Sequence, residues 1–255
     1  MHAATVTDRF SREGARLGQY GAVFSFRVFG IPVKVNASFL LVAALLGLSG
    51  GRVSLVLTWV GVVFVSILVH ELGHALTARS FGATVAIELN GIGGLTKWSG
   101  TEEQLGPGRR AAIAAAGSAV GVIFGALIWV FEQTTGPYGG ELGFTISTLV
   151  WVNVFWGLLN WLPIRPLDGG HLLVSLLQKL TPTRVVVISN VIFLVSSAAA
   201  LAVSLLLHLY FVAFLAGWLL LGELSQGRPR RPAVPIPPMT FDPPEPAEEP
   251  DKTDG

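Results

Sequence analysis

The chain is dominated by apolar stretches, each close to the length that crosses a bilayer. They cover about residues 36–50, 53–79, 111–131, 142–162, 185–205 and 208–224. A helix needs about 20 predominantly apolar residues to span the hydrocarbon core. The pattern therefore predicts about six transmembrane helices. The first stretch is short. No Gly or Pro marks a turn near His208, so one long kinked helix is an alternative for the last two stretches.

Residues 82–100 interrupt this pattern between the second and third stretches. Their sequence, GATVAIELNGIGGLTKWSG, alternates apolar and polar residues, is rich in β-branched side chains and is punctuated by glycine. These features are typical of a short β-hairpin rather than a helix. The predicted fold class is an α-helical polytopic membrane protein with a membrane-associated β-hairpin between helices 2 and 3.

The two ends of the chain differ from this core. The first 35 residues are polar-rich and lack the apolar segment of a secretory signal. After about residue 226 the chain is dense in proline and acidic at its end, a composition that favours disorder. We expect a cytoplasmic N-terminal arm over 1–35, a membrane core over 36–226 and a disordered tail over 227–255.

Composition supports the membrane class and excludes several kinds of function. Hydrophobic residues make up 51% of the chain and charged residues 13%, about half the charged share of a soluble domain. The net charge of +1 is not that of a nucleic-acid binder, so the expected environment is the lipid bilayer. Cysteine is absent, which excludes disulfides, thiolate metal sites and a cysteine nucleophile.

The basic residues orient the predicted helices. If the N-terminus is cytoplasmic, every one of the 17 Lys and Arg residues except Arg52 falls on the cytoplasmic side. This is a strong positive-inside bias. We therefore expect a multi-pass protein of the cell membrane with both termini in the cytoplasm.

The second apolar stretch ends in SILVHELGHALTARSFGA, which carries the first chemical motif. His70 and His74 are four residues apart and would share one face of a helix. Two imidazoles at this spacing can bind one zinc ion, with Glu71 beside them as a base. The alternative is a core helix that contains two histidines by chance. An ionisable group within a span costs roughly 2.5–3.5 kcal/mol on insertion scales, which argues against an idle Glu71.

A catalytic zinc site needs a third protein ligand. His2 falls in the polar arm and His208 near the expected outer face, so both are poorly placed. Asp168 and His171 occur in NWLPIRPLDGGHLL, where two prolines should break the helix. A broken helix at membrane depth lines a cavity or is buried in protein, which favours Asp168 as the third ligand. A loop aspartate at the membrane surface is the alternative.

Together the two motifs resemble the site-2 protease family of intramembrane zinc metalloproteases. That family pairs H-E-x-x-H on one transmembrane helix with N-x-x-P-x-x-x-x-D-G on another. Here the motifs are residues 70–74 and residues 160–169. The hairpin glycines Gly91, Gly93 and Gly94 also match, and order and spacing agree over about residues 36–224.

The resemblance implies a zinc metalloendopeptidase that cuts single-span membrane proteins within or near their transmembrane segments. His70, His74 and Asp168 would hold one zinc ion per chain, and Glu71 would be the general base. The active site would lie toward the cytoplasmic side of the membrane.

The resemblance also implies roles in substrate binding. Asn160 would contact the substrate backbone or the developing oxyanion. Asn153 matches another asparagine of the family, and a polar packing residue is an equal alternative. An unwound substrate could add to the hairpin edge as a strand, with Gly91, Gly93 and Gly94 allowing close approach of the backbones. The alternative is that these glycines serve only the turn.

The chain departs from the family in two respects. The third span of the family commonly carries A-G-P-x-x-N, whereas here Gly117 is followed by Ser118 and no asparagine appears. The family often carries a PDZ or CBS domain, and no segment outside the spans is long enough for either. A compact form is therefore expected.

Other functions stay open at this point. A catalytically silent zinc-binding scaffold would use the same ligands, although it has no use for Glu71. A metal transporter usually shows internal repeats of helices, and none is visible here. A docking role for the proline-rich tail is weaker than simple disorder.

Overall fold

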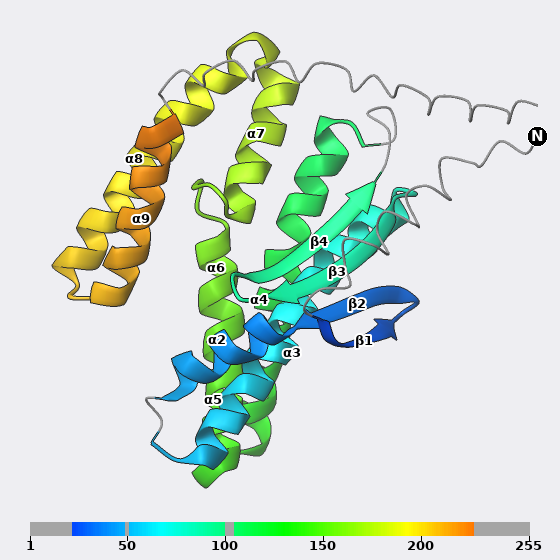
Figure 1. The fold of residues 1–255 in the computed structure, drawn as a ribbon, viewed down its shortest axis with the longest axis vertical. Coiled ribbons are helices and arrows are strands. Elements are labelled where there is room, and N and C mark those ends of the chain that lie inside the picture. Colours follow the sequence, from blue (N-terminus) through cyan, green and yellow to red (C-terminus); the bar gives the residue numbers. More distant parts are fainter. Residues whose placement is uncertain (1–21, 49–50, 100–104, 227–255) are drawn as a thin grey trace, which may run out of the picture.

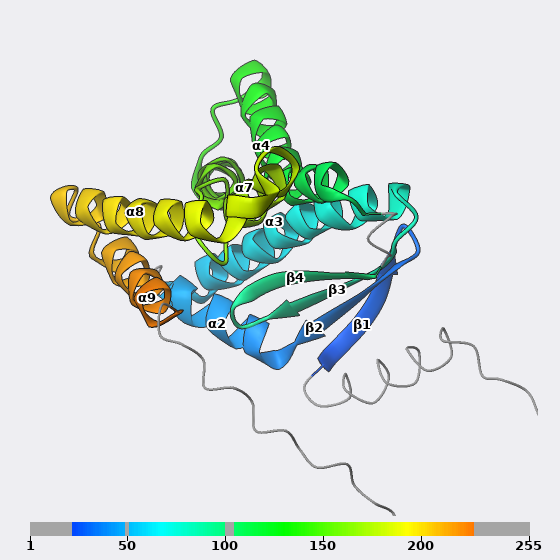
Figure 2. The ribbon, with the colours of Figure 1, turned by 90° about the horizontal axis from the view of Figure 1, so that it is seen from above.

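A computed structural model describes residues 22–48, 51–99 and 105–226 of the 255-residue chain. It is a bundle of helices that carries a small sheet on one side (Figures 1 and 2). Part of the expected N-terminal arm and the whole expected tail, 227–255, lie outside the described residues.

The helices and strands of the described part follow one another along the chain, with a π-helical turn between α5 and α6 and a 3₁₀ turn before α8. They are β1 (Ala22–Val28), β2 (Ile31–Asn36), α2 (Ala37–Gly47), α3 (Val53–Ser80), β3 (Thr84–Asn90), β4 (Gly93–Ser99), α4 (Pro107–Thr135), α5 (Gly140–Trp151), the π-helical turn (Val152–Trp156), α6 (Gly157–Asn160), α7 (Asp168–Leu180), the 3₁₀ turn (Pro182–Arg184), α8 (Val185–Leu206) and α9 (Tyr210–Gln226).

Within the described ranges, 4 helical segments are long and apolar enough to cross a membrane. They are Val53–Ser80, Pro107–Thr135, Gly140–Asn160 and Pro182–Leu206. The first and last predicted stretches form the shorter apolar helices α2, of 11 residues, and α9, of 17 residues. The prediction of a mostly helical membrane fold is confirmed, whereas two of the six expected spans are shorter than a typical crossing.

The last two apolar stretches form separate helices. α8 ends at Leu206 and α9 begins at Tyr210, and the two helices lie side by side (Figure 1). Between them His208 has a φ of 56°, a left-handed conformation that few non-glycine residues adopt. The alternative of one long kinked helix is therefore wrong. The chain turns between the two helices although neither Gly nor Pro is present there.

The segment predicted as a hairpin forms half of a larger sheet. β3 and β4 pair antiparallel, β2 pairs parallel with β3, and β1 pairs antiparallel with β2. The strand order is β1-β2-β3-β4. No strand was expected over residues 22–36, which supply the other half of the sheet.

One face of the sheet packs on α3. Alternate residues of β2 and β3 are buried, as expected when successive side chains point to opposite faces of a strand. They are Ile31, Val33, Val35, Val85, Ile87 and Leu89. They share an apolar core with Ala75 and Ala78 of α3, so the sheet is attached to the half of α3 that contains the histidine motif.

α4 packs on the other side of α3 from the sheet (Figure 2). A Cβ added at Gly73 would lie 2.7 Å from the carbonyl oxygen of Ala116 and 2.9 Å from Cα of Gly117. Only glycine leaves room for backbones this close, and small residues commonly permit such contacts between membrane helices. α3 is thus held between the sheet and α4.

A further helix, α7, lies in the segment expected to connect the fourth and fifth spans. At Gly169 an added Cβ would collide with the carbonyl oxygen of Trp161, and at Gly170 it would lie 2.8 Å from that of Ile164. The glycine pair therefore lets the preceding loop fold over the first turn of α7. This turn begins at Asp168, and α7 packs against α4.

The close approach at Gly73 predicts a specific loss of stability. Gly73→Ala should destabilise the fold by about 1–3 kcal/mol, since backbone atoms must shift to admit the methyl group. Gly61→Ala is the matched control, because Gly61 lies on the same helix with nothing within 4 Å of its added Cβ. Thermal unfolding of the purified protein in detergent should show a lower midpoint for Gly73→Ala alone. Equal midpoints for the two variants would contradict the packing.

Candidate metal centre

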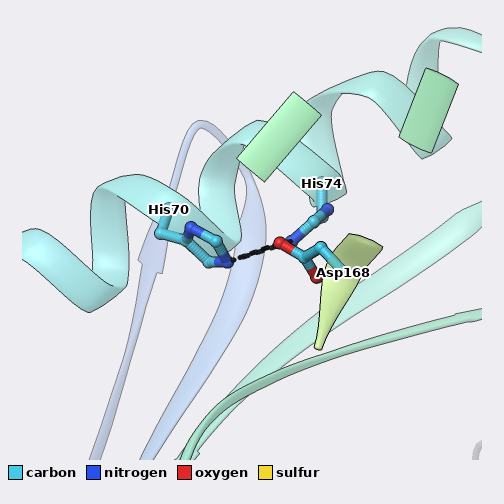
Figure 3. A group of neighbouring side chains, drawn as sticks. All are labelled: His70, His74 and Asp168. Atoms are coloured by element: carbon cyan, nitrogen blue, oxygen red, sulfur yellow. Dashed lines mark hydrogen bonds and ion pairs between the residues drawn. The ribbon is translucent and has the colours of Figure 1, made fainter. Parts of the chain in front are cut away.

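Three side chains from two separate helices converge at one point (Figure 3). His70 and His74 come from α3, and Asp168 comes from the first turn of α7. Nε2 of each histidine lies 3.2 Å from Oδ2 of Asp168, and the two Nε2 atoms are 3.2 Å apart. The structure thus brings together the three residues that were predicted as metal ligands.

The spacing of these three atoms suits a tetrahedral ion. Zinc bonds to nitrogen and oxygen of about 2.0–2.1 Å place neighbouring ligands about 3.3–3.4 Å apart. The three separations of 3.2 Å agree with this to within the tolerance of about 0.2 Å expected of a genuine site. Two imidazoles and one carboxylate are also a common ligand set for zinc, and they leave one position open.

α4 fixes the orientation of His74. Its Nδ1 lies 2.7 Å from the carbonyl oxygen of Ile113. Because a carbonyl only accepts, Nδ1 carries the hydrogen of this bond, and Nε2 is the ring nitrogen that faces Asp168. A Cβ added at Gly117 would collide with the imidazole ring. His74 is therefore buried against a backbone that sets both its position and its tautomer.

Glu71 is buried beside the cluster, where β4 packs on it. Oγ1 of Thr96 donates to Oε2 of Glu71 at 2.6 Å and lies 3.1 Å from its backbone carbonyl oxygen. A Cβ added at Gly94 would collide with the carboxylate. Gly94 and Thr96 are two residues apart and so share one face of the strand. Sequence reasoning missed Thr96, although this alternation was a signal that could have found it.

The three hairpin glycines have different surroundings. The N–H of Gly91 donates to Oγ of Ser38 on α2 at 3.1 Å. Gly93 has a φ of 135°, a conformation that other residues rarely adopt, and it closes the turn opposite Asn90. Gly94 is the member of this set that touches Glu71. Their role in substrate binding stays a prediction.

The two predicted asparagines lie in neighbouring elements. Asn153 is part of the π-helical turn, and Asn160 is the last residue of α6. Asn153 is buried, and its amide nitrogen donates to Oγ of Ser66 and to the carbonyl oxygen of Leu149, both at 2.8 Å. These contacts agree with the alternative prediction, in which Asn153 is a polar residue of the helix packing. Asn160 is half-buried at the end of α6. The next residue is Trp161, whose carbonyl oxygen lies against Gly169. Contact of either asparagine with substrate stays a prediction.

Ser118 lies next to the cluster. It is the residue at which the chain departs from the third-span pattern of the family. Its side chain is fully buried, and its Oγ donates to Oδ2 of Asp168 at 3.0 Å. His171, the other candidate in the second motif, is exposed on α7 and is not part of the cluster found among the described residues.

The outer face of the sheet carries a separate charged group. Nδ2 of Asn36 donates to Oε1 of Glu88 at 2.8 Å, and Nζ of Lys97 pairs with the other carboxylate oxygen. The hydrogen bonds from Lys97 and then from Asn36 hold the pKa of Glu88 below its usual range. These three residues come from β2, β3 and β4 and stand apart from the cluster of His70, His74 and Asp168.

Comparison with known proteins places these features in a family. The family model described as Peptidase family M50 matches residues 58–145 and 139–205. A candidate zinc metalloprotease of Synechocystis sp. is 36% identical over 169 residues, which are 60% of this chain and 44% of that protein. A zinc metalloprotease of Methanocaldococcus jannaschii is 30% identical over 159 residues, 60% of this chain and 45% of that protein.

A solved structure shares the fold. The site-2 protease from Methanocaldococcus jannaschii aligns with a TM-score of 0.57 at 24% identity, covering 82% of this chain and 97% of that one. The chain spans less than half the length of the curated relatives it matches. The family match covers both chemical motifs and more than half of the 255 residues, and it confirms the resemblance seen in them: the chain belongs to peptidase family M50.

Proposed function

We propose that this chain is a zinc metalloendopeptidase that hydrolyses peptide bonds within or near the transmembrane segments of membrane-anchored proteins. The observation that carries the proposal is the meeting of His70, His74 and Asp168 beside a buried Glu71. Membership of the family and the names of the relatives support it. A silent zinc-binding scaffold is the second candidate, and it would leave the contacts of Glu71 without a use.

His70, His74 and Asp168 would hold one zinc ion, with Nε2, Nε2 and Oδ2 as the ligand atoms. When bound, zinc supplies Lewis-acid chemistry that polarises a carbonyl and lowers the pKa of water. The hydrogen bond from Nδ1 of His74 to Ile113 leaves Nε2 as the ligand nitrogen and keeps it directed at the site.

Glu71 would act as the general base and then as the general acid. Its carboxylate accepts a proton from the water that attacks the scissile carbonyl, and it returns the proton to the leaving amine. Thr96 holds Oε2 by a hydrogen bond of 2.6 Å, which fixes the orientation of the carboxylate. Asn160 would donate a hydrogen bond to the developing oxyanion.

The sheet would receive the substrate. A transmembrane helix hides its carbonyls in its own hydrogen bonds, so the segment must unwind before attack. β4 is an edge strand of the described sheet, and an edge can accept an extended peptide by main-chain hydrogen bonds. Since Gly94 and Thr96 of the same strand touch Glu71, a peptide paired with β4 would lie close to the base.

The proposed topology has six membrane-crossing segments with both termini in the cytoplasm. The 4 long helices would be joined by α2 and α9, the shorter apolar helices. The distribution of Lys and Arg supports this orientation. In this orientation the sheet and the metal centre would lie toward the cytoplasmic side.

Replacement of the base tests the enzymatic proposal. Glu71→Gln should lower the rate of substrate cleavage by about 10²–10⁴-fold, because an amide cannot accept the proton. The assay is co-expression with single-span membrane proteins, followed by detection of the cleaved fragment. Glu141→Gln, which alters an exposed acid at the start of α5, is the control and should cleave normally. Cleavage that is unchanged in Glu71→Gln would favour the scaffold.

Metal content tests the ligand set. The purified protein should contain about one zinc per chain, and His70→Ala and Asp168→Ala should lose most of it, because a catalytic site has only three protein ligands. Elemental analysis after dialysis measures this directly. His171→Ala, which changes an exposed histidine one turn after Asp168, should keep its zinc. Full zinc retention in Asp168→Ala would remove that residue from the set.

The absence of native cysteine allows a clean test of topology. A membrane-impermeant maleimide should label Gly139→Cys in intact cells, since the turn before α5 is expected outside. Thr183→Cys, in the exposed turn before α8, should be labelled only after permeabilisation. The opposite pattern would invert the proposed orientation, and labelling of both in intact cells would contradict the span count.

A further inference from the structure

We propose that Ser118 is a positioning residue of the metal centre, whose hydroxyl orients Asp168 and so raises the affinity for zinc, a role that rests on the zinc site of the proposed function. Ser118 would not touch the metal or the substrate. It would act through the carboxylate that does.

The contact is specific to one carboxylate oxygen. Oγ of Ser118 lies 3.0 Å from Oδ2 of Asp168, and Oδ2 is also the atom that lies 3.2 Å from both histidine Nε2 atoms. A carboxylate oxygen has two lone pairs. One can accept the hydrogen bond from Ser118 while the other faces the histidines.

Burial makes this hydrogen bond selective. Ser118 has 0% exposed surface, so no water competes for its hydroxyl. A serine inside a helix commonly bonds back to a carbonyl of the preceding turn. Here it donates instead to a residue 50 positions away in the sequence, across the interface between α4 and α7.

The hydrogen bond would restrict a side chain that can otherwise rotate. An aspartate can present either oxygen to a metal, and each orientation lost on binding has an entropic cost. A donor fixed on a rigid helix selects Oδ2 before the ion arrives. Groups that orient a metal ligand in this way typically contribute about 10–100-fold to metal affinity.

α4 would therefore support ligands from two other helices. The carbonyl of Ile113 orients His74 of α3, and Ser118, five residues later, orients Asp168 of α7. The two contacts use different atoms. Removal of the Ser118 hydroxyl leaves the contact to His74 intact, so its effect on Asp168 can be measured separately.

Helix packing is the competing explanation for a small buried serine. The carbonyl oxygen of Ser118 would lie 3.2 Å from a Cβ added at Gly157, so α4 and α6 are close at this position. Substitution to alanine keeps the helix surface small and removes only the hydroxyl. It therefore separates packing from hydrogen bonding.

The experiment measures zinc affinity by chelator competition in the purified 255-residue chain. Ser118→Ala is expected to bind zinc about 10–100-fold more weakly than the wild type. Ser197→Ala is the matched control, because Ser197 of α8 is equally buried and its Oγ has no hydrogen-bond partner among the described residues. Its affinity should equal that of the wild type.

A double-mutant cycle with Asp168→Ala gives the decisive readout. If Ser118 acts through Asp168, Ser118→Ala should cause no further loss of affinity in the Asp168→Ala background. A loss of the same size in both backgrounds would overturn the proposal and indicate an effect on packing. Thermal unfolding of the zinc-free variants checks that each one folds, and Ser118→Thr, which keeps the hydroxyl, should bind more tightly than Ser118→Ala.

The outcomes also separate this role from the proposed function. If the wild type itself binds no zinc, the zinc site fails, and the role of Ser118 fails with it. If the wild type binds zinc and Ser118→Ala binds it equally well, the zinc site stands and only the role of Ser118 is overturned.

Discussion

The close contact between α3 and α4 is the constraint on which the site depends. Gly73 and Gly117 bring the two backbones together, and this allows the ring of His74 to reach the carbonyl oxygen of Ile113. A side chain at either glycine would separate the helices and displace the imidazole. α7 packs on the same helix α4, so Asp168 meets the histidines only while this spacing is kept.

The sheet adds a second constraint from the opposite side of α3. Its buried face shares an apolar core with Ala75 and Ala78, while the edge strand β4 reaches Glu71 through Gly94 and Thr96. The residues of this motif thus point to two different sides of α3. His70 and His74 face Asp168 beside α4 and α7, and Glu71 is held by the sheet.

The long helices and the residues of the cluster could be predicted from the sequence for a physical reason. Spans need long apolar runs, and the spacing of His70 and His74 is set by one helical turn. The strands over 22–36 were missed because the chain up to residue 35 was treated as one polar-rich arm. β1 and β2 are about as long as β3 and β4, and the two-residue turn between them contains Gly30. α7 was missed because two prolines precede it and two glycines lie in its first turn. Ser118 makes its contact over 50 residues, which no local pattern reveals, whereas the alternation of β4 was a signal that could have pointed to Thr96.

The hydrogen bond between Thr96 and Glu71 has a consequence for selectivity. Under the proposed function, the strand that pairs with the peptide is the strand that aligns the proton acceptor. A transmembrane segment that keeps its helix cannot pair with β4, so its carbonyls would stay in their own hydrogen bonds and away from Glu71. Intact membrane helices would be spared because of their own regular structure.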